Sequence, residues 1–259
     1  MKIDSHQHFW HFNKQDYGWM DDSMSVIKRD FLPEHLLSEL RSVGFDGSIA
    51  VQARQTLEET RWLLQLADSY PEIKGVVGWV DLQSEQADEQ LSAFAGHPKA
   101  VGVRHVIHDE ADDDFMLRPS FVRGLRLLVK YKLAYDLLIF PRHLPNTLKL
   151  IEQLDVKQAV VVDHIAKPLI KEGILSPWKE NIRRLADFPS VYCKVSGMVT
   201  ETDWHNWNPD DIKPYLDVVF EAFGPERIMI GSDWPVCLLA GSYSRVMDVV
   251  LDYISGLQA

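Results

Sequence analysis

Two histidines, His6 and His8, stand one residue apart near the start of the chain, after a short apolar segment. In a β-strand, residues i and i+2 project from the same face, so both imidazoles would leave the end of one strand together. Such a pair can hold a divalent metal ion or transfer protons at the mouth of a barrel. By itself the pair is more often a surface or structural feature. Polar clusters also end three later apolar segments, at Arg104 and His105, at Asp163 and His164, and at Ser232 and Asp233.

The chain alternates short apolar segments with longer amphipathic stretches. The short segments are rich in Val and Ile and apolar on nearly every residue, which is typical of strands buried on both faces. Eight such strands alternating with helices predict a parallel (β/α)8 barrel, an α/β fold, and 259 residues suit a single barrel domain over 1–259. An open doubly wound sheet is the disfavoured alternative, because no Gly-rich loop follows the first strand. The expected strands cover 1–8, 47–53, 75–81, 100–107, 133–140, 158–164, 190–196 and 227–233, and the expected helices cover 33–43, 57–69, 118–130, 144–154, 177–188, 209–223 and 243–257.

Two segments interrupt this alternation. Residues 9–32 are rich in aromatic side chains and are too long for an ordinary connection between a strand and a helix. Residues 198–208, which also contain tryptophan and acidic side chains, follow another expected strand end. These aromatic residues either pack the loop onto the barrel or form a lid or pocket wall. Both can hold together, because barrel active sites are built from such loops.

Composition narrows the function classes. The net charge of −11 argues against a nucleic-acid partner and favours a neutral or cationic small molecule. No run of 18 apolar residues predicts a membrane span, and no signal-peptide pattern follows Met1. Cys193 and Cys237 are too few for a disulfide framework. We therefore expect a cytoplasmic protein that acts on a small molecule without nucleic acid or membrane partners, and the sequence leaves a homodimer open.

In a barrel, polar groups at the C-terminal strand ends face one site. His6, His8, His164 and Asp233 would form a set of three nitrogen donors and one oxygen donor, which zinc or manganese accepts with one position left for water. Asp233 could instead act as a general base that touches the metal only loosely. Burying all four groups without a function would be costly.

Further polar residues at the strand ends are candidates for substrate binding. Arg104 could clamp a carboxylate or a polarised oxygen with two hydrogen bonds. His105 is its neighbour and would point to the opposite face unless the strand ends between them. Lys194 could place a cation near a carbonyl group, and Ser196 could donate a hydrogen bond. Trp10 from the aromatic loop and Arg54 at the second strand end complete this set.

Six short motifs, in order along nearly the whole chain, resemble the amidohydrolase superfamily, and within it the sugar-lactone hydrolases of the amidohydrolase-2 family, the L-fuconolactonase and L-rhamnonolactonase type. The resemblance implies a (β/α)8 barrel, hydrolysis of a lactone or related ester, metal- or carbonyl-facing histidines at His6, His8 and His164, and a base at Asp233. It also implies that Arg104 and Lys194 bind substrate. Metal use varies in this branch. The resemblance therefore implies a divalent metal, with zinc as the preferred ion, and leaves a metal-independent enzyme as the alternative. The motifs are residues 4–10, 75–81, 102–105, 163–168, 194–197 and 231–235.

Three other functions are also compatible with these residues. A metal-dependent decarboxylase of an aromatic or unsaturated acid would use the same histidines and aspartate, but it usually has a glutamate in the first strand motif, where this chain has Gln7 and His8. A metal-free hydrolase of a dicarboxylate lactone would need several arginines around its pocket, and Arg54, Arg104 and Arg142 could supply them. A barrel that only binds a metabolite is the non-enzymatic alternative.

Overall fold

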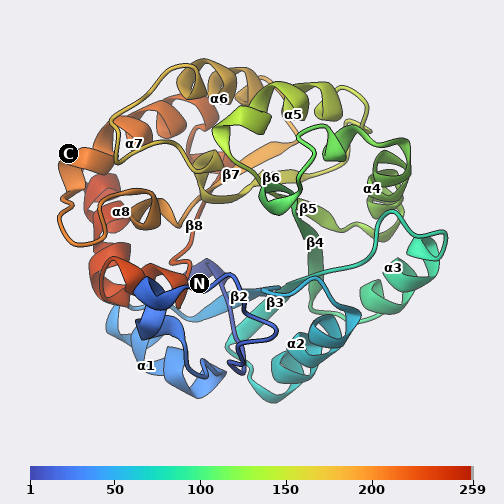
Figure 1. Cartoon of the computed structure of the whole chain (residues 1–259), viewed down its shortest axis with the longest axis horizontal. Coiled ribbons are helices and arrows are strands. Elements are labelled where there is room, and N and C mark those ends of the chain that lie inside the picture. The colour runs from blue at the N-terminus through green and yellow to red at the C-terminus, as the bar shows by residue number, and fades with distance from the viewer. Residues whose placement is uncertain (258–259) are drawn as a thin grey trace.

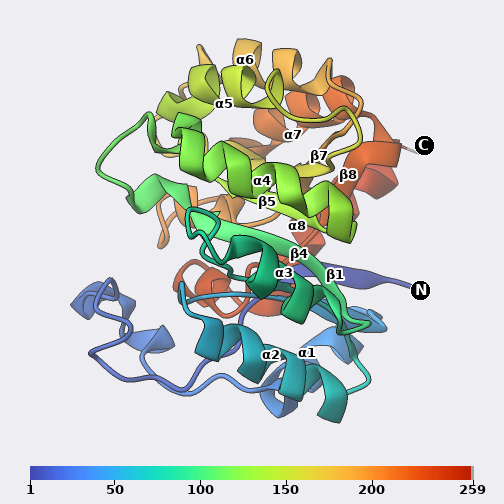
Figure 2. The same ribbon diagram turned by 90° about the vertical axis from the view of Figure 1, so that its right-hand side faces the viewer.

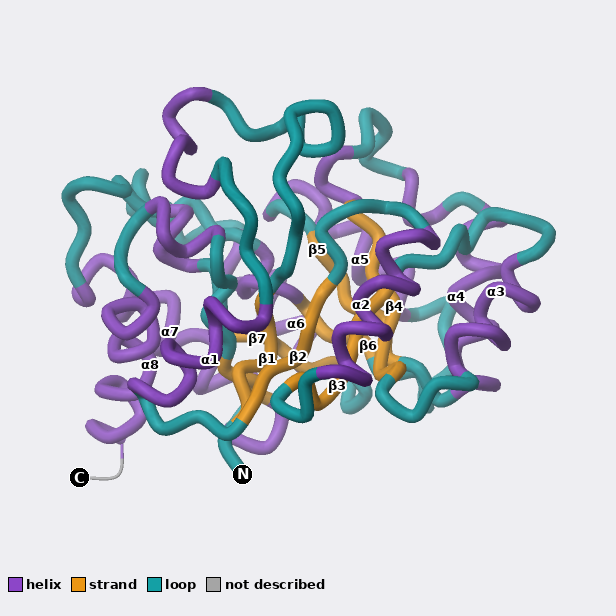
Figure 3. Tube along the Cα trace, turned by 90° about the horizontal axis from the view of Figure 1, so that it is seen from below, coloured by secondary structure: helices purple, strands orange, loops and turns teal. Residues whose placement is uncertain are grey.

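Eight parallel strands lie side by side in chain order in the computed structural model, which describes residues 1–257, and the helices form a ring around them (Figure 1). The tube in Figure 3 shows the same arrangement with the orange strands inside the purple helices. This arrangement confirms the predicted (β/α)8 barrel. The strands are β1 (Ile3–Gln7), β2 (Gly47–Val51), β3 (Ile73–Gly78), β4 (Ala100–Val106), β5 (Ala134–Leu138), β6 (Val160–Val162), β7 (Val191–Val195) and β8 (Ile228–Ile230).

Eight α-helices follow the strands in turn within residues 1–257, and each expected helix is found within a few residues of its predicted bounds. Pro33 and Pro209 begin α1 and α7, as first-turn prolines do. The sequence prediction omitted α3, a nine-residue helix whose buried face consists of Ala87, Leu91 and Phe94. The helices are α1 (Pro33–Ser42), α2 (Leu57–Ser69), α3 (Ala87–Ala95), α4 (Pro119–Tyr131), α5 (Leu144–Ile151), α6 (Trp178–Ala186), α7 (Pro209–Phe223) and α8 (Tyr243–Leu257).

The barrel closes through the residues that follow β8. The backbone N–H of His8 donates to the carbonyl of Trp234 at 2.7 Å, and the N–H of Asp233 donates to the carbonyl of His6 at 2.8 Å. Below them the buried carboxylate of Asp4 accepts hydrogen bonds from the backbone and hydroxyl of Ser232, at 2.9 and 2.6 Å. The hydrogen bonds that close the barrel therefore also align the polar residues of the first strand with those that follow β8.

The long segment between β1 and α1 stands out from the barrel at the end opposite the N-terminus, where it is drawn in blue (Figure 2). Trp10 and Phe31 exchange two backbone hydrogen bonds of 2.9 Å across its base. Both side chains are buried, as are Tyr17 and Ile27. The aromatic residues thus pack the loop onto the barrel, which was the first of the two roles expected for them.

Among residues 1–257, no helix combines the length and the apolar character that crossing a membrane requires.

Candidate metal and catalytic site

Four donor atoms meet at the C-terminal end of the barrel. Nε2 of His6 lies 3.2 Å from Nε2 of His8, which lies 3.3 Å from Oδ1 of Asp233. The same carboxylate oxygen is 3.8 Å from Nε2 of His6 and 3.8 Å from Nε2 of His164. All four side chains are buried. The structure thus brings the four residues of the predicted donor set to one end of the barrel, with His6, His8 and Asp233 as the group whose donor atoms all lie within 4.8 Å of one another.

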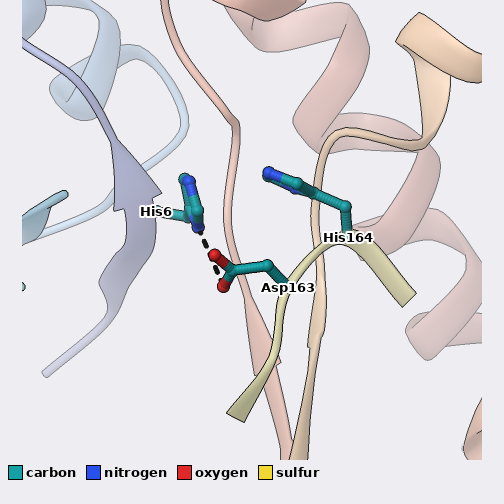
Figure 4. Close-up of side chains that lie close together, drawn as sticks. All are labelled: His6, Asp163 and His164. Carbon is teal, nitrogen blue, oxygen red and sulfur yellow. Dashed lines mark ion pairs between the residues drawn. The ribbon is translucent and has the colours of Figure 1, made fainter. Parts of the chain in front are cut away.

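Each histidine presents Nε2 to this centre because its Nδ1 faces another group. Nδ1 of His8 lies 2.8 Å from the carbonyl oxygen of Val51, and Nδ1 of His164 lies 2.9 Å from Oγ of Ser196. Nδ1 of His6 faces Oδ1 of Asp163 at 3.4 Å, the contact drawn as a dashed line in Figure 4. In each ring, a proton on Nδ1 would leave the Nε2 lone pair free to bind a metal. His6 also faces two cations, since Nζ of Lys194 lies 3.4 Å from its Nδ1 and Nη1 of Arg104 lies 3.2 Å from its Nε2.

The separations of these donors suit a small divalent cation. A tetrahedral zinc ion with bonds of 2.0–2.1 Å to nitrogen places its ligands about 3.3–3.4 Å apart. The 3.2 and 3.3 Å separations around His8 match this value closely, and the two 3.8 Å separations to Asp233 are slightly longer. His6, His8 and Asp233, whose donor atoms all lie within 4.8 Å of one another, therefore fit a small divalent cation such as zinc, and Nε2 of His164 lies 3.8 Å from the same Asp233 oxygen.

The local electrostatics favour the metal-binding protonation states. Burial lowers the pKa of His6 and of His164 well below the ordinary histidine value, so both rings are neutral near pH 7. Burial raises the pKa of Asp233, but its contacts with His164 and His8 and the charge of Lys167 outweigh burial, and the net pKa lies below the ordinary value. Neutral imidazoles and an ionised carboxylate are the forms that bind metals.

Asp163 supports His6 from behind. A second group of donors, His6 with Asp163 and His164, also has its atoms within 4.8 Å of one another. The Asp163 carboxylate, however, already faces two cations, Nζ of Lys194 at 3.2 Å and Nη1 of Arg104 at 3.2 Å. Burial alone would raise the pKa of Asp163, but these cations hold it well below its usual range. We therefore assign Asp163 to orienting His6.

A cavity of about 350 Å³ opens above the donor set. His8, His164 and Asp233 form its floor together with Arg104, whose Nη1 lies 3.2 Å from Nε2 of His6. The aromatic loop supplies part of the wall, so it also meets the second expectation, that of a pocket wall. The remaining lining residues are Trp10, Trp19, Met24, Ala53, Val106, His108, Asp109, Leu138, Phe140, Lys167, Thr200, Glu201, Trp204, Val236 and Leu239.

Two of the six residues expected to bind substrate, Trp10 and Arg104, line this cavity. His105 does not, because it follows Arg104 in the strand and points outward, where its ring stacks on Phe115 with centroids 4.7 Å apart and its Nε2 lies 2.7 Å from Glu110.

The other three residues in that set also lie away from the cavity. Lys194 lies beneath His6 and pairs with Asp136 and Asp163, so its ammonium supports the floor and does not reach the opening. Ser196 is buried against His164. Arg54 pairs with Asp16 at 3.2 Å in a neighbouring cavity.

The arginine set proposed for a dicarboxylate-lactone hydrolase is not assembled. Arg104 lines the cavity, but Arg54 pairs with Asp16, and Arg142 pairs with Asp113 at 3.0 Å on the exposed surface. A single arginine at the floor does not match a substrate with two carboxylates.

Several residues at the site had no predicted role, although Asp163 was named in one of the polar clusters. Asp163 and Asp136 lie in the buried charge network below the histidines, and Asp4 anchors the barrel closure. Lys167 and Glu201 form an ion pair in the cavity wall. Lys167 and Asp163 belong to the motif over 163–168, so their place beside His164 was the available signal.

Comparison with known proteins agrees with this geometry. The family described as Amidohydrolase matches residues 3–252. An L-fucono-1,5-lactonase of Burkholderia multivorans (strain ATCC 17616 / 249) is 41% identical over 260 residues, covering 96% of this chain and 87% of that protein. An L-fucono-1,5-lactonase of Burkholderia ambifaria is 38% identical over 244 residues, covering 93% of this chain and 83% of that protein. A crystal structure of a Burkholderia multivorans amidohydrolase with bound zinc is similar at a TM-score of 0.95 and 41% identity, covering 99% of this chain and 92% of that chain.

Proposed function

Since this chain belongs to the amidohydrolase family, and within it to the lactone-hydrolysing branch, we propose that it hydrolyses a small sugar lactone to the open sugar acid. The substrate class is an aldonolactone such as L-fucono- or L-rhamnono-lactone. One observation carries the assignment to this site. An ionised aspartate, Asp233, lies 3.3–3.8 Å from the Nε2 atoms of three histidines at the floor of a cavity that can enclose one sugar ring.

Asp233 is the general base in this proposal. Its carboxylate takes a proton from a water molecule while the water oxygen attacks the lactone carbonyl carbon. Asp233 then returns the proton to the ring oxygen as the bond between this oxygen and the carbonyl carbon breaks. The lowered pKa of Asp233 keeps the carboxylate ready to accept the first proton at neutral pH.

Arg104 faces the charge that develops on the carbonyl oxygen. The backbone carbonyl of Gln52 and the carboxylate of Asp163 accept hydrogen bonds from its guanidinium, which fixes the orientation of the side chain. A positive group that is positioned before the reaction stabilises an oxyanion without further rearrangement.

We also propose that the site binds a divalent metal ion, with zinc as the preferred ion. His6, His8, His164 and Asp233 would hold it. The donor atoms of His6, His8 and Asp233 lie within 4.8 Å of one another, and zinc in the similar Burkholderia multivorans structure supports the presence of a metal. When bound, the metal would lower the pKa of the attacking water and polarise the carbonyl group.

The function is tested by turnover of a panel of aldonolactones, which includes L-fucono- and L-rhamnono-lactone. Each hydrolysis releases an acid, so a pH indicator follows it directly. We expect hydrolysis of at least one member, lost on chelation and restored by zinc. Turnover that survives chelation would move oxyanion stabilisation to Arg104 and the histidines alone. No turnover of any lactone would refute the proposal and favour the decarboxylase.

A further inference from the structure

The connection after β6 is a left-handed turn of four residues, none of them glycine. His164, Ile165, Ala166 and Lys167 have φ values of 54°, 49°, 61° and 48°. The backbone N–H of Lys167 closes the turn by donating to the carbonyl of His164 at 2.8 Å. Each L-residue in this conformation costs about 1–2 kcal/mol. Such strain persists where the surrounding structure imposes it, and it is concentrated at functional sites.

The turn directs two side chains into the same cavity. Residues i and i+3 of a helical turn lie on one face, and both His164 and Lys167 line the cavity above the donor set. The residues between them are held by the core, because Ile165 and Ala166 are fully buried and Nε1 of Trp178 donates to the carbonyl of Ile165 at 2.7 Å. The same strained turn therefore places a metal-facing imidazole and a cation.

The Lys167 ammonium meets the carboxylate of Glu201, which follows β7. Their side chains are 13% and 18% exposed, so the pair is mostly shielded but still opens to the cavity. His108 stands on the same wall, and burial, together with the charge of Lys167 and others, lowers its pKa to about 3. This part of the wall therefore presents the Lys167–Glu201 ion pair and the His108 ring, and the Asp109 carboxylate lies beside that ring, with Oδ1 3.4 Å from its Nε2.

We propose that the Lys167–Glu201 ion pair binds two adjacent hydroxyl groups of the lactone substrate and so determines which stereoisomers are accepted. This inference rests on the proposed function. An ammonium group only donates hydrogen bonds and a carboxylate only accepts them. Two adjacent hydroxyl groups match this pair, because one can donate a hydrogen bond to Glu201 while the oxygen of the other accepts a hydrogen bond from Lys167. An epimer at either carbon would turn one hydroxyl away from its partner.

The hydrogen-bond donors of Thr200 and Trp204, which line the cavity with the pair, are already used within the protein. The hydroxyl of Thr200 donates to the carbonyl of Gly197 at 2.7 Å, and Nε1 of Trp204 donates to the carbonyl of Thr200 at 2.9 Å. These two donors are therefore occupied, whereas the ammonium and carboxylate of the ion pair can bind hydroxyl groups in addition to each other.

The test compares lactones that lack one hydroxyl with the parent lactone. For wild type, we expect kcat/KM to fall about 10- to 100-fold for the deoxy lactones at two adjacent positions, the value of a hydrogen bond to a charged group. In Glu201→Gln, the penalty at one of these positions should shrink at least several-fold. In Lys167→Met, the penalty at the other should shrink, and KM should rise more than kcat falls in both variants. Lys213→Met is the control, since it breaks an exposed ion pair with Asp217 on α7 and should keep the wild-type ratios.

The outcomes separate this inference from the function on which it rests. Deoxy penalties that are unchanged in both variants would overturn it, because a purely structural ion pair alters stability and not hydroxyl preference. Should the variants fail to fold, the wild-type panel decides alone, and the absence of two adjacent sensitive positions overturns the inference. No turnover of any lactone by wild type would refute the proposed function itself, and the inference with it.

Discussion

Asp163 stands directly behind His6, with Oδ1 of the carboxylate 3.4 Å from Nδ1 of the imidazole (Figure 4). The contact fixes the ring so that Nε2 faces His8 and Asp233. The carboxylate is itself held ionised by Lys194 and Arg104. The two buried cations thus act on His6 both through this aspartate and directly, since Nη1 of Arg104 lies 3.2 Å from Nε2 and Nζ of Lys194 lies 3.4 Å from Nδ1 of the ring.

Asp163→Asn should weaken zinc binding about 10- to 100-fold, because the asparagine cannot stabilise the His6 tautomer as a carboxylate does. The zinc affinity of the folded variant, measured by competition with a chelator, gives this value. Asp68→Asn is the matched control, since it alters a histidine–aspartate contact of 3.0 Å with His97 on the outside of the barrel. Equal zinc affinities for wild type and Asp163→Asn would show that His6 needs no support from this carboxylate.

Gly197 leaves room for the His164 ring. A Cβ built at this position would lie 2.4 Å from Nδ1 of His164, and φ is +60°. Gly173 also has a positive φ, +67°, but a Cβ there would meet nothing within 4 Å. We expect Gly197→Ala to reduce the free energy of unfolding by about 1–3 kcal/mol more than Gly173→Ala, and to weaken zinc binding as the ring shifts. Denaturant unfolding and zinc affinity test this, and equal effects of the two substitutions would contradict the steric argument.

Glu59 couples the stability of the barrel to pH. Its carboxylate is buried at the start of α2, where it accepts hydrogen bonds from the backbone of Ala53 and Arg54 at 3.1 and 2.6 Å. Burial nevertheless raises its pKa to about 7 from an ordinary 4.5. Between these values the folded protein keeps a proton that the unfolded chain has released, so this group reduces stability as the pH rises.

Glu59→Gln should therefore gain stability relative to wild type as the pH rises from 4.5 to 7, by about 3 kcal/mol over the window, since one pKa unit corresponds to 1.36 kcal/mol. Denaturant unfolding at several pH values measures this difference. Glu58→Gln removes the same charge at the exposed neighbouring position and should follow the wild-type pH dependence. A constant difference between Glu59→Gln and wild type would show that Glu59 titrates normally.

The sequence predicted the parts of the molecule that depend on periodicity and chain order. Apolar strands alternating with amphipathic helices required the barrel, and the barrel required that His6, His8, His164 and Asp233 meet at one end. The motifs predicted the family, which is confirmed. The single-domain boundary, the homodimer and the cytoplasmic location stay predictions.

The side chains beneath and beside this donor set could not be predicted in the same way. The alternation of a strand gives the face of Lys194 but not its depth, and the side chain ends one layer below the cavity, against Asp136. The turn over 164–167 has no sequence signature, because Ile165 and Ala166 are residues that avoid left-handed φ and adopt it here only under tertiary constraint. The position of Lys167 follows from that constraint.

The most direct test of the account is the turnover of Asp233→Asn on a lactone that wild type hydrolyses, with zinc at saturating concentration. Asparagine keeps the size of the side chain but cannot take the proton from water. We predict a folded, zinc-binding protein whose kcat is about 100- to 10,000-fold below that of wild type. A kcat near the wild-type value would show that Asp233 is not the base and that another group at the floor of the cavity moves the proton.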